Sequence, residues 1–206
     1  MDEDLVLIDR FKAGDQTAFD ELMQRHYRSV LNLVYRFTGA TGQPAEDLAQ
    51  DVFLRVYRAL PRFQARARFF TYLYKVTMNL CLKERARWAR RRSRTVSLDS
   101  NWDDPEVPNF RVIPDPAGSA QDRFERQEVA GEVRDAVMEL PEDQRAAVIL
   151  HRFHHLSYEE ITEVLGISLP AVKSRLHRAK LALQKKLAET AGPEVSEPGR
   201  QEAAGS

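Results

Sequence analysis

The sequence predicts an all-α protein of two small helical domains joined by a flexible linker, the second domain containing a helix-turn-helix. Apolar residues recur at steps of three and four along most of the chain, and no stretch shows the sustained alternation of a β-strand. Residues 96–120 interrupt this pattern with four prolines and several acidic residues, as a linker does. The 206 residues are enough for two separate cores. We therefore expect domains at 1–95 and 121–190, and a disordered tail at 191–206.

Four helices are expected in the N-terminal domain. The first covers 3–12, and a longer one ends at Gly39, a residue type that closes helices because it tolerates the left-handed conformation. The third opens near Pro44, since proline suits the first turn of a helix, and runs to Leu60. The fourth, at 69–94, begins with an apolar stripe and ends in a cluster of arginines.

The linker at 96–120 is rich in proline and acid and has little to bury. At about 3 Å per residue it would let the two domains sit tens of Å apart. The second domain is expected to begin near Gln121 with one helix and to continue with another after Pro141. Beyond Ala191 the chain has too few apolar residues to fold.

A helix-turn-helix is predicted between Ser157 and Leu187. Ser157 and Glu160 have the spacing of a capping box, which marks a helix start. Gly166 then suits the turn, and Ser168 can cap the next helix. One buried stripe of that second helix is formed by Val172, Leu176, Ala179, Leu183 and Leu187.

The outward side of the second helix carries polar hydrogen-bond donors near its start. They are Lys173, Ser174, Arg175, His177 and Arg178. Donors at the beginning of such a helix are what a major groove of duplex DNA accepts. The alternative is a solvated amphipathic hairpin in an ordinary helical domain, because runs of charge often only face water.

The formal net charge of zero conceals a strong segregation of charge. Residues 61–95 carry eleven Lys or Arg against one acidic residue, and residues 143–190 carry eight against five. Between them, residues 96–142 carry four against twelve. Two basic zones separated by an acidic one are consistent with a polyanionic partner.

The first basic zone, 62–94, also contains six aromatic residues. Cations hold phosphates, whereas aromatic rings stack on unpaired bases and contribute roughly 1–3 kcal/mol per base. The combination indicates a site for single-stranded or melted DNA. Core packing is the alternative, and it accounts for Phe69 but less well for Phe70, Tyr72 and Tyr74, which fall on other sides of the helix.

Three segments carry a resemblance to a known family. They read AEDLAQDVFLRVYRAL, FFTYLYKVTMNLCLKERARWARRR and LPEDQRAAVILHRFHHLSYEEITEVLGISLPAVKSRLHRAKLALQKKL. In this order and separation, they resemble the extracytoplasmic-function sigma factors of bacterial RNA polymerase. The resemblance implies an alternative sigma factor that directs promoter-specific initiation, reading the minus-35 element as duplex and the minus-10 element as opened strand. The partners it implies are core RNA polymerase (clamp coiled coil and flap), promoter DNA and an anti-sigma factor.

The resemblance also implies roles for individual residues. The polymerase-docking residues are Asp47, Gln50, Asp51 and Phe53. The minus-10 residues are Phe63, Arg66, Arg68, Phe70, Tyr72 and Asn79. The minus-35 residues are the five donors of the second helix, Lys173, Ser174, Arg175, His177 and Arg178.

Three positions depart from the family pattern and concern specificity. Tyr72 stands where the family usually has tryptophan, the loop FQARAR lacks the usual glycine and acid, and His177 replaces more common residues of the recognition helix. The promoter sequence is therefore not predicted.

No enzyme, cofactor or metal is expected. His151 and His155 have the spacing of a two-histidine metal face, but no third ligand completes it nearby. The lone Cys81 is expected in a core, and no apolar run is long enough to span a membrane, so a cytoplasmic location is expected. A free-standing helix-turn-helix regulator is the main alternative, and an adaptor that binds only proteins is a third.

Overall fold

A computed structural model describes residues 2–65, 68–95 and 131–190, and side chains at 2–65, 68–91 and 131–189. In these ranges all regular structure is helical, as the sequence predicted. The predicted linker at 96–120, the start of the second domain and the tail at 191–206 lie outside the described residues.

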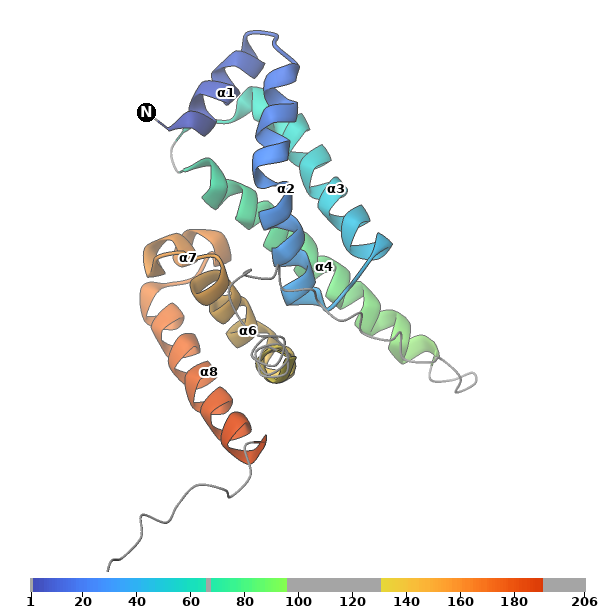
Figure 1. Cartoon of the computed structure of the whole chain (residues 1–206), viewed down its shortest axis with the longest axis vertical. Helices are drawn as coiled ribbons and strands as arrows, with labels where there is room; N and C mark the ends of the chain where they lie inside the picture. The colour runs from blue at the N-terminus through green and yellow to red at the C-terminus, as the bar shows by residue number, and fades with distance from the viewer. Residues whose placement is uncertain (1, 66–67, 96–130, 191–206) are drawn as a thin grey trace, which may run out of the picture.

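The N-terminal domain consists of four α-helices and one short 3-10 turn (Figure 1). The helices are α1 (Glu3–Lys12), α2 (Thr17–Thr38), α3 (Gln43–Ala59) and α4 (Phe69–Thr95), and the 3-10 turn covers Leu60–Arg62. Their bounds agree with the expected ones to within a few residues. Helix α2 packs against α1, α3 and α4, so it forms the centre of the domain.

The core of this domain is apolar and excludes solvent. Phe37, Phe69, Leu22, Leu33 and Leu73 are all at most 1% exposed. Helix α1 is fastened to α2 by a polar cluster rather than by apolar contacts alone. Its centre is the buried Asp4, which accepts hydrogen bonds from Arg25 at 3.2 Å and from His26 at 2.9 Å. Burial acts to raise the pKa of Asp4, but these two partners outweigh it and lower the pKa overall.

The C-terminal domain contains a helical segment at 131–139, α6 (Glu142–Val148), a π-helical turn (Ile149–Phe153), α7 (Tyr158–Leu165) and α8 (Leu169–Thr190). Helices α7 and α8 form the predicted helix-turn-helix. Both bonds of the capping box are present, since Glu160 N donates to the Ser157 hydroxyl and Ser157 N donates to the Glu160 carboxylate. Gly166 closes α7 with φ 64°, in the left-handed region.

Helix α8 is held in place by its predicted stripe. Val172 and Ala179 are fully buried, and Leu176, Leu183 and Leu187 are half-buried. Helix α8 packs on α6 and α7. Its polar side therefore faces away from the domain.

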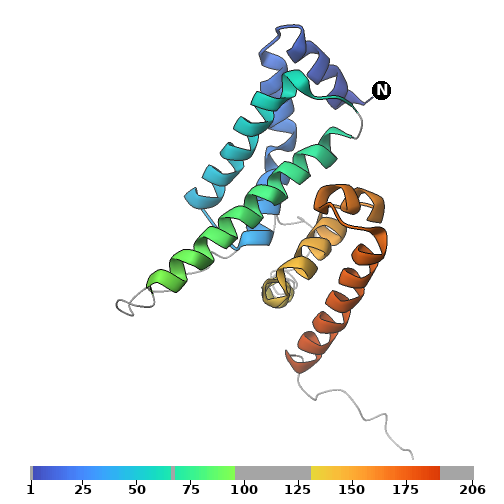
Figure 2. The same ribbon diagram turned by 180° about the vertical axis from the view of Figure 1, so that it is seen from behind.

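The two domains lie against each other, although the sequence only predicted that a linker would let them separate. Helix α4 packs beside α7, and α2 packs beside the π-helical turn (Figures 1 and 2). Gly39 shows how close the contact is: a Cβ at this position would lie 2.8 Å from the Met138 Cε. The φ of 73° that ends α2 favours glycine here, and the flexible end of the Met138 side chain packs into the space that a Cβ would take.

A buried arginine connects the two domains. Arg145 of α6 is 5% exposed, and it donates to the carbonyl of Leu140 at 2.9 Å, to that of Phe37 in α2 at 3.3 Å, and to that of Met138. Burial, assisted by the charge of Arg85, lowers the pKa of Arg145 to about 10. The side chain therefore remains protonated near neutral pH and donates to carbonyl groups near the ends of two helical segments, one of which, that of Phe37, also accepts from Arg85 at 3.4 Å.

Candidate nucleic-acid and protein-docking surfaces

The first candidate surface is the outward side of α8, here called the α8 surface. Lys173, Ser174, His177 and Arg178 are all exposed. Their spacing of i, i+1, i+4 and i+5 places them within roughly 140° of the helix circumference, so their donors point in one general direction. An exposed set of donors on the second helix of a helix-turn-helix is able to enter a major groove.

Arg175 differs from its four neighbours. It is half-buried, and its Nε lies 3.3 Å from the Asp143 carboxylate of α6. This ion pair directs the guanidinium toward the body of the domain. Arg175 therefore supports the position of α8 rather than adding to the exposed set.

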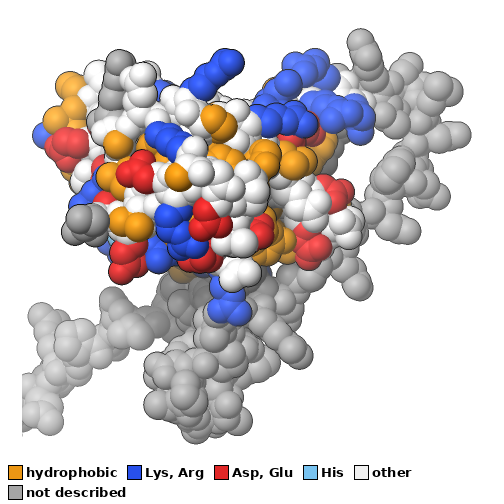
Figure 3. All heavy atoms as spheres, turned by 90° about the horizontal axis from the view of Figure 1, so that it is seen from above, with side chains coloured by type: hydrophobic (Ala, Val, Ile, Leu, Met, Phe, Trp, Pro, Cys, Tyr) orange, Lys and Arg blue, Asp and Glu red, His pale blue; other side chains and the backbone are white. Residues whose placement is uncertain are grey.

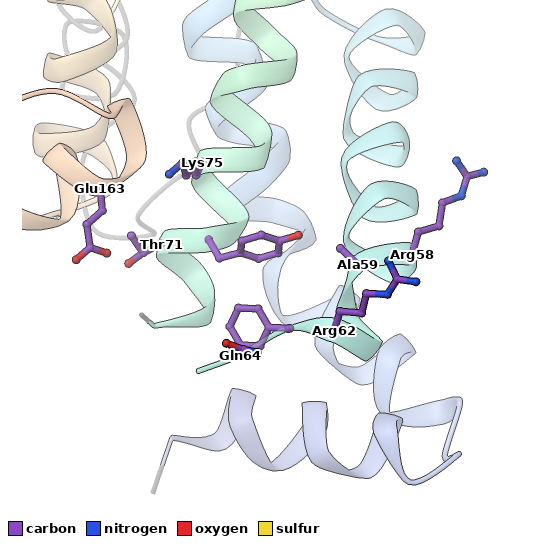
Figure 4. A pocket seen from close by; sticks show the side chains of 9 residues that line it. Arg58, Ala59, Arg62, Gln64, Thr71, Lys75 and Glu163 are labelled. Atoms are coloured by element: carbon purple, nitrogen blue, oxygen red, sulfur yellow. The ribbon is translucent and has the colours of Figure 1, made fainter. Parts of the chain in front are cut away.

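The second candidate surface is a pocket of about 600 Å³ where α3, the 3-10 turn, α4 and α7 meet (Figure 4). We call it the basic pocket. It is lined by Arg58, Ala59, Arg62, Phe63, Gln64, Thr71, Tyr72, Lys75 and Glu163. Arg58 and Arg62 stand on one side of it, and Lys75 stands on the other. The pocket thus combines cations for phosphates with rings for bases.

The two aromatic rings of the basic pocket, Phe63 and Tyr72, pack against the core of the N-terminal domain. The Phe63 ring lies 5.3 Å from that of Tyr72 and 5.9 Å from that of the buried Phe69. Phe63 and Tyr72 are both half-buried, and burial raises the pKa of the Tyr72 phenol. The two rings are therefore held from behind and open on one side, as a stacking platform needs to be.

Three more of the residues predicted for strand binding, Arg68, Phe70 and Asn79, do not line the pocket. Phe70 packs against Tyr74 at 6.0 Å between ring centroids, with the Arg68 guanidinium 5.7 Å from its ring. Asn79 is exposed on α4, two turns beyond Tyr72. Arg66 lies outside the described residues. Of the five that the structure describes, Phe63 and Tyr72 are brought together in the pocket.

Sequence reasoning missed three cations of the pocket, Arg58, Arg62 and Lys75. They come from α3, the 3-10 turn and α4. The spacing of Arg58 and Arg62 by four residues places both on one side of the chain, but their convergence with Lys75 depends on how the helices pack. The sequence analysis also favoured a strand-binding role over core packing for Tyr74, but the structure places it at 7% exposure in the contact between the domains.

The third candidate surface is the exposed side of α3, here called the α3 face. Asp47 and Gln50 are exposed and Asp51 is half-buried. Asp47 accepts a hydrogen bond from Gln43 at 2.7 Å, and Asp51 accepts one from Arg55 at 3.0 Å. These bonds leave acceptor capacity on both carboxylates for a basic partner.

Phe53, which the resemblance assigned to polymerase docking, does not lie on this face. It is 4% exposed and stacks on Tyr27, with ring centroids 6.1 Å apart, so its side chain belongs to the core. The apolar residue that the face presents is Leu54, which is 54% exposed. Leu54 follows Asp47 by seven residues, which is two helical turns, so both lie on one side of α3.

His154 has a role at the contact between domains that its sequence context did not indicate. Its Nδ1 lies 3.1 Å from the Tyr74 hydroxyl, and the two rings meet edge to face at 4.9 Å. Burial, together with the charges of Arg36 and His155, lowers the pKa of His154 to about 4. At neutral pH this imidazole is therefore uncharged.

Two further features of the described residues bear on function. No group of three or more His, Cys, Asp or Glu side chains in this part of the chain is arranged to hold a metal ion. Cys81 is buried, and burial raises the pKa of its thiol to about 12, so it is an unreactive core residue. Within the same residues, no helix has the length and apolar character needed to cross a membrane.

The chain matches two family models, in the order in which its two domains occur. Residues 22–95 match Sigma-70 region 2, and residues 130–183 match Sigma-70, region 4. The RNA polymerase sigma-H factor of Pseudomonas aeruginosa is 32% identical over 186 residues, which cover 90% of this chain and 94% of that protein. The ECF RNA polymerase sigma-E factor of Escherichia coli K12 is 32% identical over 191 residues, covering 89% and 94%.

Two solved structures share the fold. One is CnrH in complex with the cytosolic domain of CnrY, with a TM-score of 0.62, 24% identity, and coverage of 91% of this chain and 99% of that one. The other is the sigma factor RpoE in complex with the anti-sigma factor NepR from Bartonella quintana, with a TM-score of 0.63, 20% identity, and coverage of 82% and 96%. At these identities the likeness concerns the fold alone.

Proposed function

The chain belongs to the extracytoplasmic-function class of the sigma-70 family, and from this premise we propose how its surfaces direct promoter-specific transcription initiation. The α8 surface reads the minus-35 element as duplex, the basic pocket holds an opened minus-10 strand, and the α3 face docks on core RNA polymerase. The observation that carries the proposal is the presence, in one chain, of an exposed cationic recognition helix and a separate aromatic pocket lined with cations.

At the minus-35 element, Lys173, Ser174, His177 and Arg178 supply donors to the major groove. Arginine and lysine suit the acceptors of guanine, and serine is able to bond to more than one base. Because Arg175 pairs with Asp143, we assign it to holding α8 and not to base contact.

At the minus-10 element, the basic pocket receives a base that has left the helical stack. Extrusion of a base costs a few kcal/mol. Stacking on Phe63 and Tyr72 offsets this cost at about 1–3 kcal/mol per base, and Arg58, Arg62 and Lys75 attract the phosphates of the strand. Arg66, Arg68, Phe70 and Asn79 are kept as contacts along the strand outside the pocket.

The α3 face would bind the clamp coiled coil of core polymerase. Asp47, Gln50 and Asp51 offer acceptors to basic side chains, and Leu54 supplies the apolar contact. The C-terminal domain would contact the flap. These contacts would hold the two DNA-binding surfaces at a fixed spacing. Two domains joined only by a flexible linker would have no fixed spacing.

An anti-sigma factor is the expected inhibitor. Both structural relatives are complexes, one with the cytosolic domain of CnrY and one with the anti-sigma factor NepR. We expect the chain to act in the cytoplasm as a non-catalytic subunit, because all its candidate surfaces are suited to binding. Family membership disfavours a free-standing regulator.

The test is transcription by purified chain and sigma-free core polymerase on genomic DNA of the source organism. We expect new transcript 5′ ends that share upstream minus-35 and minus-10 elements, and that require both components. Transcripts unaltered by the chain, or operator binding that is tight without polymerase and unaffected by it, would reject the proposal.

A further inference from the structure

Helix α1 contacts the chain segment that carries one ring of the basic pocket. The ammonium of Lys12, in the last turn of α1, donates a hydrogen bond to the Phe63 carbonyl at 2.7 Å. Helix α1 also packs on the 3-10 turn Leu60–Arg62, and Figure 4 shows it running below Gln64. The match to Sigma-70 region 2 begins at residue 22, so it does not include α1. The bond therefore joins the proposed minus-10 site to a helix outside that match.

The Lys12 bond completes the set of contacts that orient Phe63. The backbone N–H of Phe63 donates to the Leu60 carbonyl at 3.0 Å, and the ring packs on those of Phe69 and Tyr72. Lys12 takes the remaining backbone group, the carbonyl. Both backbone groups from which the ring projects are thus engaged, so Lys12 helps to fix one half of the stacking platform.

The end of α1 that carries Lys12 is itself held firmly against α2. Arg10 donates to the Asp15 carboxylate at 2.7 Å and to that of Glu21 at 3.1 Å. Asp15 in turn accepts from the backbone N–H of Thr17, at the start of α2, at 3.0 Å. This network fixes the backbone of the last turn of α1, and with it the point from which Lys12 reaches Phe63.

The charge of Lys12 has no carboxylate partner among the described residues, in contrast to that of Arg10. Figure 3 views the molecule from the α1 end and shows acidic side chains interspersed with Lys and Arg. Arg10 pairs with two of these acids, Asp15 and Glu21, whereas Lys12 is exposed and bonded to a carbonyl. An ammonium has three N–H donors, so two remain for a further acceptor.

A strand phosphate is the acceptor that fits this position. A base stacked on Phe63 and Tyr72 carries a phosphate on each side of its sugar, close to the ring that holds it. A lysine ammonium binds phosphate as a point charge and needs no fixed fork geometry. Lys12 would thus add a cation beside Phe63, on the α1 side, to the three that line the pocket.

Resting on the proposed function, we propose that the minus-10 site extends onto α1, where Lys12 positions Phe63 and binds a phosphate of the opened strand. The Phe63 carbonyl holds the ammonium beside the ring, and a base that stacks on the ring brings its phosphate to the two remaining donors. Such a contact is independent of base sequence and weakens as salt rises.

The experiment separates the charge of Lys12 from its hydrogen bond. Lys12→Ala removes both, Lys12→Gln keeps an N–H donor without the charge, and Lys12→Arg keeps the charge. The matched control is Arg28→Ala, which removes an exposed charge from α2, a helix that contributes no residue to the pocket. Thermal unfolding of each full-length variant checks that it remains folded.

Binding of fluorescein-labelled random 15-mers, as single strands and as duplexes, is measured over a series of salt concentrations. At low salt we expect Lys12→Ala to bind single strands about three- to fivefold more weakly. The slope of log affinity against log salt should become shallower by about 0.7, the value for one phosphate contact on a single strand. Lys12→Gln should lose the same slope, and Lys12→Arg and Arg28→Ala should keep it. Duplex binding should not change.

Unchanged strand affinity and slope in Lys12→Ala would overturn the inference. Weaker affinity with an unchanged slope would overturn it as well, because Lys12 would then only position Phe63. Tyr72→Ala in the same assay distinguishes failure of this inference from failure of the proposed function. Strand binding that is unaffected by Tyr72→Ala would reject the proposed pocket. A loss in Tyr72→Ala without one in Lys12→Ala would reject the role of Lys12 alone.

Discussion

The α8 surface and the basic pocket are both cationic, but they are prepared for DNA in different ways. Lys173, Ser174, His177 and Arg178 stand exposed on one helix whose position is fixed by its own domain. The pocket is assembled from three elements of the N-terminal domain and is walled by Glu163 of the other domain. A duplex presents its groove without rearrangement, whereas a separated strand exists only after melting. The surface that is needed later is the one that lies beside the other domain.

The two DNA contacts are therefore coupled through the contact between domains. A change at α8 affects duplex reading alone, because the α8 surface takes no part in that contact. A change on α7 alters strand binding even though α7 itself need not touch the strand.

Tyr72→Ala should have the largest effect on strand binding. It removes one of the two rings of the stacking platform, and we expect a loss of about 1–3 kcal/mol in binding of a single-stranded minus-10 oligonucleotide. Tyr72→Phe, which keeps the ring, is the matched control and should bind nearly as wild type. Fluorescence anisotropy with strand and duplex probes measures both. An equal loss on duplex would contradict the assignment of Tyr72 to the strand.

Arg178→Ala should weaken minus-35 use by about 1–2 kcal/mol, because it deletes an exposed donor of the recognition helix. Arg175→Ala is the internal comparison, since its side chain pairs with Asp143. We expect it to lower thermal stability slightly and promoter preference little. Transcription from promoters with varied minus-35 sequence distinguishes them. Specificity that depends on Arg175 and not on Arg178 would reverse the assignment.

Glu163→Lys should strengthen single-strand binding by roughly 1 kcal/mol, because an exposed charge contact of this kind contributes up to about that amount. Glu159→Lys adds the same charge to the exposed side of α7 but does not line the pocket. The difference in anisotropy titrations between the two variants isolates the effect of the pocket wall from non-specific attraction. Equal gains from both variants would mean that only net charge matters.

Mild acid should open the domains through His154. Its pKa is about 4 when the domains are in contact, against an ordinary 6.5, so the contact is favoured at neutral pH and is weakened as pH falls below 6.5. The groups that face it are the Tyr74 hydroxyl, the Arg36 guanidinium and the His155 imidazole. Between pH 7.5 and 6.0 we expect the opening equilibrium to rise roughly fourfold.

His154→Phe supplies the control for this pH effect, since it keeps a ring beside Tyr74 and has nothing to titrate. Energy transfer between dyes on the two domains reports opening. The same pH dependence in wild type and His154→Phe would show that another group controls the contact.

Local structure could be predicted from the sequence because its causes are local. The capping box at Ser157 and Glu160, the turn at Gly166 and the stop at Gly39 each follow from residues within one or two turns. The resemblance assigned Phe53 to polymerase docking, although helical periodicity places it on the apolar side of α3. Residues 47, 50, 51 and 54 share one side, and residue 53 faces the core.

The basic pocket and the contact between the domains could not be predicted in the same way. The pocket depends on the packing that brings Arg58, Arg62 and Lys75 together, and no single segment contains that pattern. His154 meets Tyr74 across eighty residues of chain, and one histidine in a turn gives no sign of such a partner. Contacts of this kind follow from tertiary structure alone.

The central claim is that one chain binds duplex and opened strand through two separate surfaces. The most direct measurement is the affinity of Tyr72→Ala and Arg178→Ala for strand and duplex probes in the same anisotropy assay. We predict that Tyr72→Ala loses strand affinity and keeps duplex affinity, and that Arg178→Ala does the reverse. Loss of affinity for both probes in either variant would contradict the account.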